Sequence, residues 1–210
     1  MARNLDPKCK QCRRESTKLF LKGDKCFSSK CPMLKRDYAP GIHGVNNKRR
    51  RASSYGSQLR EKQKAKRLYQ ILEKQFKNYY IRATQMSGDV SESLMQLLER
   101  RFDNIVYRLG FATSRTTARQ LINHGHITIN GKKVTIPSYQ LKVGDEITIK
   151  KSYLEKSFWK TQVEKLGKND VPGWLNFDLA KKTGVVVSLP KKDDFTVPFD
   201  VTLIIEFYSR

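Results

Sequence analysis

Four cysteines, all within the first 31 residues of a 210-residue chain, have a spacing that could hold a metal ion. Cys9 and Cys12 form a C-x2-C pair, and Cys26 and Cys31 form a C-x4-C pair, with thirteen residues between the pairs. Two close pairs of thiolates joined by a loop can surround one tetrahedral ion, as in structural zinc sites. Neighbouring lysines and arginines should lower the thiol pKa and partly offset the charge of four thiolates. We predict a structural site, because four thiolates leave no position open for catalysis.

Three other uses of these cysteines stay open. An iron–sulfur cluster also accepts four cysteines. A redox C-x-x-C motif normally lies beside a strand–helix–strand pattern, whereas the flanks here are polar and rich in turn residues. A persistent disulfide is rare in a reducing compartment, and the start MARNLDPKC has no apolar core like that of a signal peptide. We therefore expect zinc in a cytoplasmic protein, where the metal replaces the hydrophobic core that a segment of ~35 residues cannot build.

The charge of the chain indicates a polyanionic partner. Lys and Arg number 42 against 20 Asp and Glu, for a formal net charge of +22, and residues 1–70 alone hold twenty basic and five acidic side chains. A solvated helix face would need no such excess of one sign, so we expect nucleic acid. No apolar run approaches the ~18 residues that span a bilayer, and the basic segments lack a broad apolar face for a membrane surface. We expect no membrane partner.

The elements that would position these groups are mainly helices in the first half of the chain. Residues 35–56 contain glycine, proline and basic side chains and predict an extended loop without its own core. Apolar periodicity predicts helices over residues 57–83, over 91–109 with a serine cap at Ser91, and after a cap at Thr113 or Ser114. We expect Arg115 and Arg119 on an outer face of this last helix.

The second half of the chain predicts strands. Asn130-Gly131 between two β-branched runs is a strong hairpin signal, and EITIKK predicts a further strand. WLNFDLAKKTGVVVSLP predicts two more strands, and Trp159 and Trp174 are expected to anchor packing. The terminal segment DVTLIIEFYSR fits either a strand or a helix, and we favour a last helix capped by Asp200.

The segment RRFDNIVYRLGFATSRTTARQLINHGHITINGKKV resembles the helix–loop–strand RNA-binding module of the family of the fourth small-subunit ribosomal protein. The opening ARNLDPKCKQCRRE, the loop YAPGIHG, the segment YGSQLREKQKAKRLYQILEKQFKNYY and the ending IIEFYSR resemble the bacterial family in the same order. The module alone occurs in many RNA-modifying enzymes and synthetases. The resemblance from end to end is far more specific, and it matches the variety of this family that keeps four cysteines.

The resemblance implies an α+β fold with three parts. Residues 1–45 would form a four-cysteine metal knob and an extended arm. Residues 46–98 with about 190–210 would form a helical rRNA-binding lobe. Residues 99–189 would form an inserted α/β lobe with a small antiparallel sheet, whose RNA-binding module covers about 99–165.

The same resemblance implies a non-enzymatic constituent of the small ribosomal subunit. It would bind 16S-type rRNA at a multi-helix junction of the 5′ domain, nucleate assembly of the subunit body and contribute to accuracy where mRNA enters. Its expected partners are rRNA, the fifth small-subunit protein and other ribosomal neighbours, and mRNA, with no small-molecule substrate. The basic loop 46–53 departs most from the family.

The candidate RNA contacts are mostly cationic side chains in three regions. The knob and arm would contribute Lys8, Arg13, Arg14, Lys22, Lys35, Arg36, His43, Lys48, Arg49, Arg50 and Arg51. The long helix would contribute Tyr55, Arg60, Lys62, Lys66 and Arg67. The module would contribute Arg115, Arg119, His124 and Lys132.

Two other classes of function compete with this interpretation. An RNA-modifying enzyme would need a catalytic constellation, but the chain has three histidines, no evident carboxylate pair and no P-loop. A zinc-dependent DNA-binding regulator would need a recognition helix between the cysteine pairs, where RRESTKLFLKGDK gives only a weak helical signal. Both are less consistent with the sequence than a ribosomal RNA binder.

Overall fold

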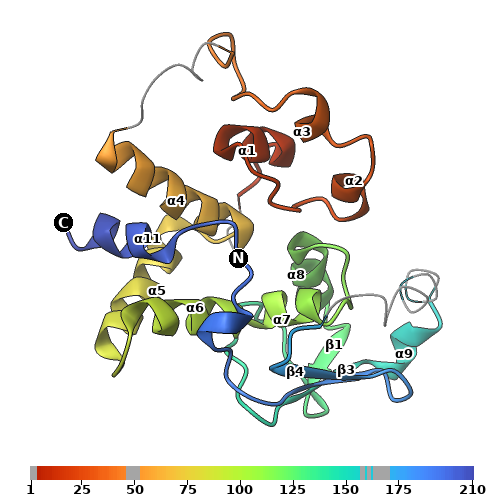
Figure 1. Cartoon of the computed structure of the whole chain (residues 1–210). Coiled ribbons are helices and arrows are strands. Elements are labelled where there is room, and N and C mark those ends of the chain that lie inside the picture. The colour runs from red at the N-terminus through yellow and green to blue at the C-terminus, as the bar shows by residue number, and fades with distance from the viewer. Residues whose placement is uncertain (1–3, 46–52, 157–158, 160–161, 163–170) are drawn as a thin grey trace. The chain divides into compact units, whose positions relative to one another are not determined.

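The computed structural model describes residues 4–45, 53–156, 159, 162 and 171–210 (Figure 1). It contains helices and one small antiparallel sheet, which confirms the predicted α+β class. The chain divides into two compact units, Met1–Leu94 with Val197–Arg210 and Met95–Thr196. The sequence placed the corresponding boundaries at residue 98 and at about 190. No helix among the described residues has the length and apolar character needed to cross a membrane.

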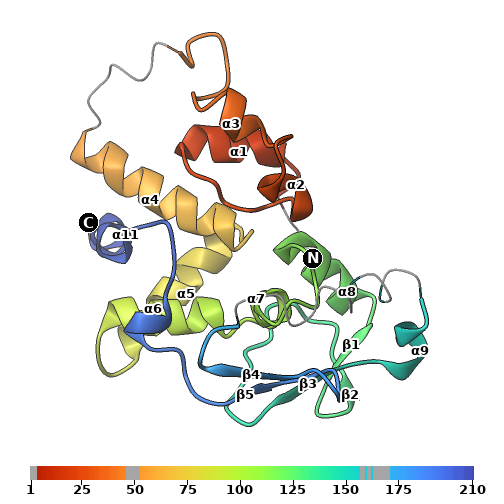
Figure 2. The same cartoon turned by 45° about the vertical axis from the view of Figure 1, so that its right-hand side comes forward.

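The first unit consists of helices and irregular segments. Its helices are α1 (Lys8–Glu15), α2 (Asp24–Phe27), α3 (Pro32–Lys35), α4 (Ser54–Leu68), α5 (Glu73–Gln85), the start of α6 (Val90–Glu99) and α11 (Val201–Tyr208). Figures 1 and 2 show α11 lying beside α4. The predicted cap at Asp200 is confirmed, because its carboxylate accepts a hydrogen bond of 2.8 Å from the backbone N–H of Thr202.

The helix predicted over 57–83 is wrong, because the chain turns in its middle. Helix α4 ends at Leu68, Gln70 takes a left-handed conformation with φ 54°, and α5 begins at Glu73. The Ile71 N–H closes the turn by donating to the carbonyl of Lys66 at 3.0 Å. This turn buries Tyr69 and Ile71 and leaves Leu72 exposed.

The helix predicted over 91–109 is also interrupted. Helix α6 ends at Glu99, α7 spans Phe102–Arg108, and Arg101 pairs as a β-bridge with Gln140. Two backbone hydrogen bonds, from Phe102 N–H to the Tyr139 carbonyl and from Leu141 N–H to the Arg100 carbonyl, replace helical bonding in this segment. The expected cap at Ser91 is wrong as well, because Ser91 donates its N–H to the Asp89 carboxylate.

The second unit packs helices α7 and α8 (Arg115–Asn123) on one side of a five-stranded antiparallel sheet (Figure 2). The order of the strands is β2-β1-β3-β5-β4, with β1 at Ile127–Ile129, β2 at Lys132–Lys133, β3 at Glu146–Ile149, β4 at Leu175–Asp178 and β5 at Thr183–Val186. Helix α9 (Lys151–Leu154) and the 3-10 helix η2 (Lys192–Asp194) complete the described elements.

Local signals predicted this unit well. Asn130 and Gly131 join β1 to β2 with φ values of 50° and 75°, as the Asn-Gly turn requires. The Ser114 hydroxyl accepts from the Thr117 N–H and caps α8. Trp159 and Trp174 lie buried in the core, which confirms their role as packing anchors.

Candidate nucleic-acid interface

The four cysteines lie in the first unit on three short helices. Cys9 and Cys12 are on α1, Cys26 is on α2, and Cys31 precedes α3. All four are free thiols, and Cys12 interacts electrostatically with each of the other three. Because four thiols are a donor set that zinc accepts, these residues fit the ion by their chemistry. Among the described residues, no group of three or more His, Cys, Asp or Glu side chains is arranged so that it could hold a metal ion.

The expected lowering of the thiol pKa is wrong for Cys12. Burial raises the pKa of this thiol, and the charges of Cys26, Cys9 and Cys31 raise it further, against a backbone hydrogen bond at Leu19 that lowers it. The lysines and arginines beside the cysteines in the sequence therefore do not control this thiol in the structure.

Cationic side chains surround a hollow of about 360 Å³ beside two of the cysteines. Its lining consists of Cys9, Lys10, Arg13, Ser29, Lys30, Cys31, Pro32, Lys35 and Arg36. Arg13 is held in place, because its Nε donates to the Tyr38 carbonyl at 3.0 Å and its guanidinium lies 4.8 Å from the centre of the Tyr38 ring. The sequence singled out Arg13, Lys35 and Arg36, but it missed Lys10 and Lys30, whose only signal was their position beside a cysteine.

The cations predicted on α4 are engaged in ion pairs. Glu15 of α1, whose side chain is fully buried, accepts from Arg60 at 3.2 Å and from Arg67. Burial raises the pKa of Glu15, while the charges of Arg60 and Arg67 lower it and partly offset that effect. This carboxylate therefore joins α1 to α4 and fixes the direction of two arginines that are themselves partly exposed.

A second carboxylate joins α4, α5 and the C-terminal helix. Glu73 accepts hydrogen bonds from Lys62 at 2.8 Å, Lys66 at 2.9 Å and the Tyr208 hydroxyl at 2.7 Å. Burial alone would raise the pKa of Glu73, but these bonds outweigh it and lower the pKa to about 2. Burial and the Glu73 carboxylate raise the pKa of Tyr208. Lys62 also lies 4.5 Å from the centre of the Phe207 ring and is buried, so the structure does not place this candidate RNA contact on the surface.

The outer position predicted for Arg115 and Arg119 in the second unit is wrong too, since both are buried. Asp103 accepts hydrogen bonds of 2.7 Å from the terminal nitrogens of both Arg101 and Arg119. Arg115 donates from Nε to the Asn104 side chain at 2.8 Å, and its guanidinium lies 4.6 Å from the centre of the Tyr107 ring. These arginines stabilise the packing of α7 and α8.

The remaining candidates differ in exposure. Arg14, Lys22, Lys35, Arg36, His43, Tyr55, His124 and Lys132 are exposed, and Lys8, Arg13, Arg60, Lys66 and Arg67 are partly exposed. Lys48, Arg49, Arg50 and Arg51 lie outside the described residues, as does part of the predicted module core.

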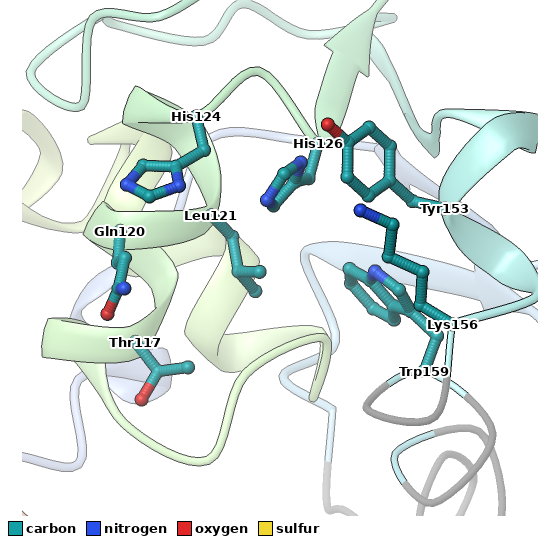
Figure 3. Close-up of a pocket in the computed structure, with 8 residues that line it drawn as sticks. All are labelled: Thr117, Gln120, Leu121, His124, His126, Tyr153, Lys156 and Trp159. Atoms are coloured by element: carbon teal, nitrogen blue, oxygen red, sulfur yellow. The ribbon is translucent and has the colours of Figure 1, made fainter.

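A pocket of about 250 Å³ lies in the second unit at the C-terminal end of α8 (Figure 3). Thr117, Gln120, Leu121 and His124 line it from α8 and its end, and His126, Tyr153, Lys156 and Trp159 line the other side. The His126 ring contacts Tyr153, with 3.8 Å between the ring centres, and lies 5.5 Å from His124. Burial, the neighbouring His124 and two lysines lower the pKa of His126. The sequence predicted His124 but gave no periodic signal that would have joined it to Tyr153 and Trp159.

Comparison with known proteins identifies the family. Residues 3–99 match the family described as ribosomal protein S4/S9 N-terminal domain, and residues 100–147 match the S4 domain. Three proteins, each named "Small ribosomal subunit protein uS4", match over the whole length of both chains: those of Desulforamulus reducens at 50% identity, Geotalea daltonii at 49% and Koribacter versatilis at 51%. With two adjoining family matches and relatives of this identity over 210 residues, the chain belongs to the ribosomal protein S4 family.

Proposed function

We propose that this chain is a structural, rRNA-binding protein of the small ribosomal subunit in bacteria. Its similarity over the full length to proteins named for that subunit carries this proposal. The family is one of ribosomal structural proteins, so the chain is not an enzyme. The excess of basic residues gives it the charge that an RNA backbone requires.

Binding would rest on phosphate contacts and on the shape of the RNA. The deep, narrow major groove of duplex RNA cannot be read by side chains, so a distributed basic surface suits a junction of helices. We assign this surface to the exposed and partly exposed candidates given above, with Lys10 and Lys30 of the hollow in the knob. Lys62, Arg115 and Arg119 are assigned a supporting role, because each is buried and bonded to protein groups.

The finer role is the one that the family resemblance implied. The chain would bind 16S-type rRNA at a multi-helix junction of the 5′ domain and nucleate assembly of the subunit body. It would also contact the fifth small-subunit protein and mRNA where the messenger enters, and so contribute to accuracy. The spread of exposed cations over both units supports a protein that touches several RNA helices at once.

Zinc in the knob is part of the proposal, with Cys9, Cys12, Cys26 and Cys31 as its ligands and an iron–sulfur cluster as the alternative. When bound, the ion would supply structural cross-linking of α1, α2 and α3 and no reaction chemistry. The knob has few other means of stabilisation, since its described apolar core is confined to Leu19, Leu21, Cys12 and Cys31.

A salt-series titration tests the RNA proposal. The protein, purified with its metal, is titrated with a 5′-domain rRNA fragment that contains the junction, and a random duplex of equal length competes. Neutralisation of ~10 phosphates predicts a log–log salt slope of about −7 to −9. We expect that steep slope with a strong preference for the junction. A slope near −2, or equal binding of both RNAs, would refute a specific junction binder.

A further inference from the structure

The pocket at the end of α8 has the dimensions and chemistry of a site for one nucleotide. Its volume of about 250 Å³ lies below the ~300–1,000 Å³ that is typical for drug-sized molecules, so it suits a group the size of a single base. Four of its lining residues carry aromatic or imidazole rings, and these come from three separate stretches of the chain (Figure 3). Such rings bind unstacked bases through their faces.

The polar groups at the pocket fit a base with a phosphate. Gln120 supplies an amide and Thr117 a hydroxyl, and each can donate and accept hydrogen bonds to the edge of a base. Lys156 brings a cation to the pocket, with its Nζ 4.2 Å from the centre of the Tyr153 ring. Lys150 acts electrostatically on His126, and none of the described lining residues is acidic. The pocket therefore suits a planar ring that is joined to a negatively charged group.

Other occupants agree less well with these contacts. Two histidines could begin a metal site, but no third His, Cys, Asp or Glu joins them among the described residues. A proton-transfer site would pair His126 with a carboxylate, whereas its described neighbours are a histidine, a tyrosine and two lysines. An apolar peptide would meet the cation of Lys156, and among the described lining residues only Leu121 offers it an aliphatic side chain.

We propose that this pocket binds one unstacked nucleotide, with its base beside the rings of His124 and Tyr153 and its phosphate beside Lys156. This inference rests on the proposed function, since the nucleotide would belong to the RNA that the chain binds. Proteins read RNA sequence mostly through bases splayed out of helices, so the pocket would add sequence recognition to a surface that otherwise contacts phosphates. A free mononucleotide shares this chemistry and is distinguished below.

The first test compares variants of the pocket in affinity for the 5′-domain rRNA fragment. Tyr153→Leu removes a ring and Tyr153→Phe keeps it, while Lys156→Gln removes the cation. Lys151→Gln is the matched control, because Lys151 is an exposed lysine of α9 that does not line the pocket. Stacking of one base predicts a loss of about 5- to 100-fold for Tyr153→Leu. Tyr153→Phe and Lys151→Gln should bind within about twofold of the unaltered protein, and all variants should show the same thermal unfolding.

The second test measures occupancy of the pocket by tryptophan fluorescence. The chain has two tryptophans, and Trp174→Phe leaves Trp159, at the wall of the pocket, as the single tryptophan, which can be excited selectively at about 295 nm, above tyrosine absorption. The rRNA fragment should quench Trp159 with the same midpoint as binding, and the quench should vanish in Tyr153→Leu. The four nucleoside 5′-monophosphates, titrated separately, should quench only at far higher concentration.

The outcomes separate this inference from the proposed function. If Tyr153→Leu binds the junction as tightly as the unaltered protein, the pocket proposal is overturned while junction binding stands. If a mononucleotide quenches Trp159 at concentrations below those of the RNA, the site serves a free nucleotide and the assignment to RNA is overturned. If the unaltered protein shows no preference for the junction, both proposals fail together.

Discussion

Replacing Asp103 with asparagine should destabilise the second unit strongly. Asp103 is 2% exposed and accepts bonds from Arg101, which is fully buried, and from Arg119. Asparagine has nearly the same volume, so Asp103→Asn creates no cavity and changes mainly the charge. It leaves two buried guanidinium groups without this carboxylate, and breaking a buried ion pair from one side typically costs about 3–5 kcal/mol.

Tryptophan fluorescence during urea unfolding measures the free energy of unfolding of the second unit, where Asp103 lies. Both tryptophans lie in the core of the second unit, so their emission follows its unfolding within the full chain. With an m value of about 2 kcal/mol per M urea, a loss of about 3–5 kcal/mol moves the midpoint down by about 1.5–2.5 M. Asp193→Asn, at an exposed position of the same unit, should change the free energy of unfolding by no more than about 0.5 kcal/mol.

A double variant tests whether the arginine pairing is the cause. Asp103→Asn with Arg119→Met removes one of the stranded charges, so it should lose clearly less stability than the sum of the two single variants. If Asp103→Asn unfolds at the same urea concentration as Asp193→Asn, the buried network does not stabilise this unit. Our assignment of Arg119 to a supporting role would then lose its basis.

Three further predictions address RNA binding, acid stability and the metal. Lys132→Gln should reduce the magnitude of the log–log salt slope for the rRNA fragment by about 0.7–0.9, as loss of one phosphate contact requires, whereas Arg119→Met should leave the slope unchanged. Glu73 has a folded pKa of about 2 against 4.5 for the free side chain. The stability that it contributes is therefore present above pH 4.5 and lost as the pH falls toward 2, and Glu73→Gln should remove this loss from hydrogen exchange of α11. Cys12→Ser should abolish binding of one zinc per chain, measured by elemental analysis, and leave the tryptophan unfolding midpoint unchanged.

Caps and turns could be predicted because their chemistry is local. Ser114 and Asp200 each accept a hydrogen bond from a backbone N–H two or three residues later, and Asn130-Gly131 directly joins two paired strands, so each of these signals lies within a few residues of sequence. The two interrupted helices could not be predicted in this way. Their breaks at Gln70 and Arg101 depend on burial and on strand-like pairing with Gln140, 39 positions away in the chain for Arg101.

The candidate RNA surface was predicted in outline but not residue by residue. The sequence pattern of a basic side chain at helical spacing is the same whether that side chain contacts phosphate or a buried carboxylate. In the structure Arg119 donates a hydrogen bond to Asp103, sixteen positions earlier, and Arg60 donates one to Glu15 on another helix. The pocket was missed for a related reason, since its rings come from stretches that only the fold brings together.

The ion pairs change what the net charge of +22 means for RNA binding. Glu15, Glu73, Glu99 and Asp103 each bond to arginine or lysine side chains, and all but Glu73 are buried. Glu15 and Asp103 each contact two arginines, so their clusters keep a positive charge, and the burial of Glu15, Glu99 and Asp103 removes three carboxylates from the surface without altering the net charge of the chain. Because repulsion between phosphate and surface carboxylates falls with every acid that is buried in this way, the outward face is more uniformly positive than the composition indicates. The acidic residues of this chain thus favour RNA binding by stabilising the scaffold from within.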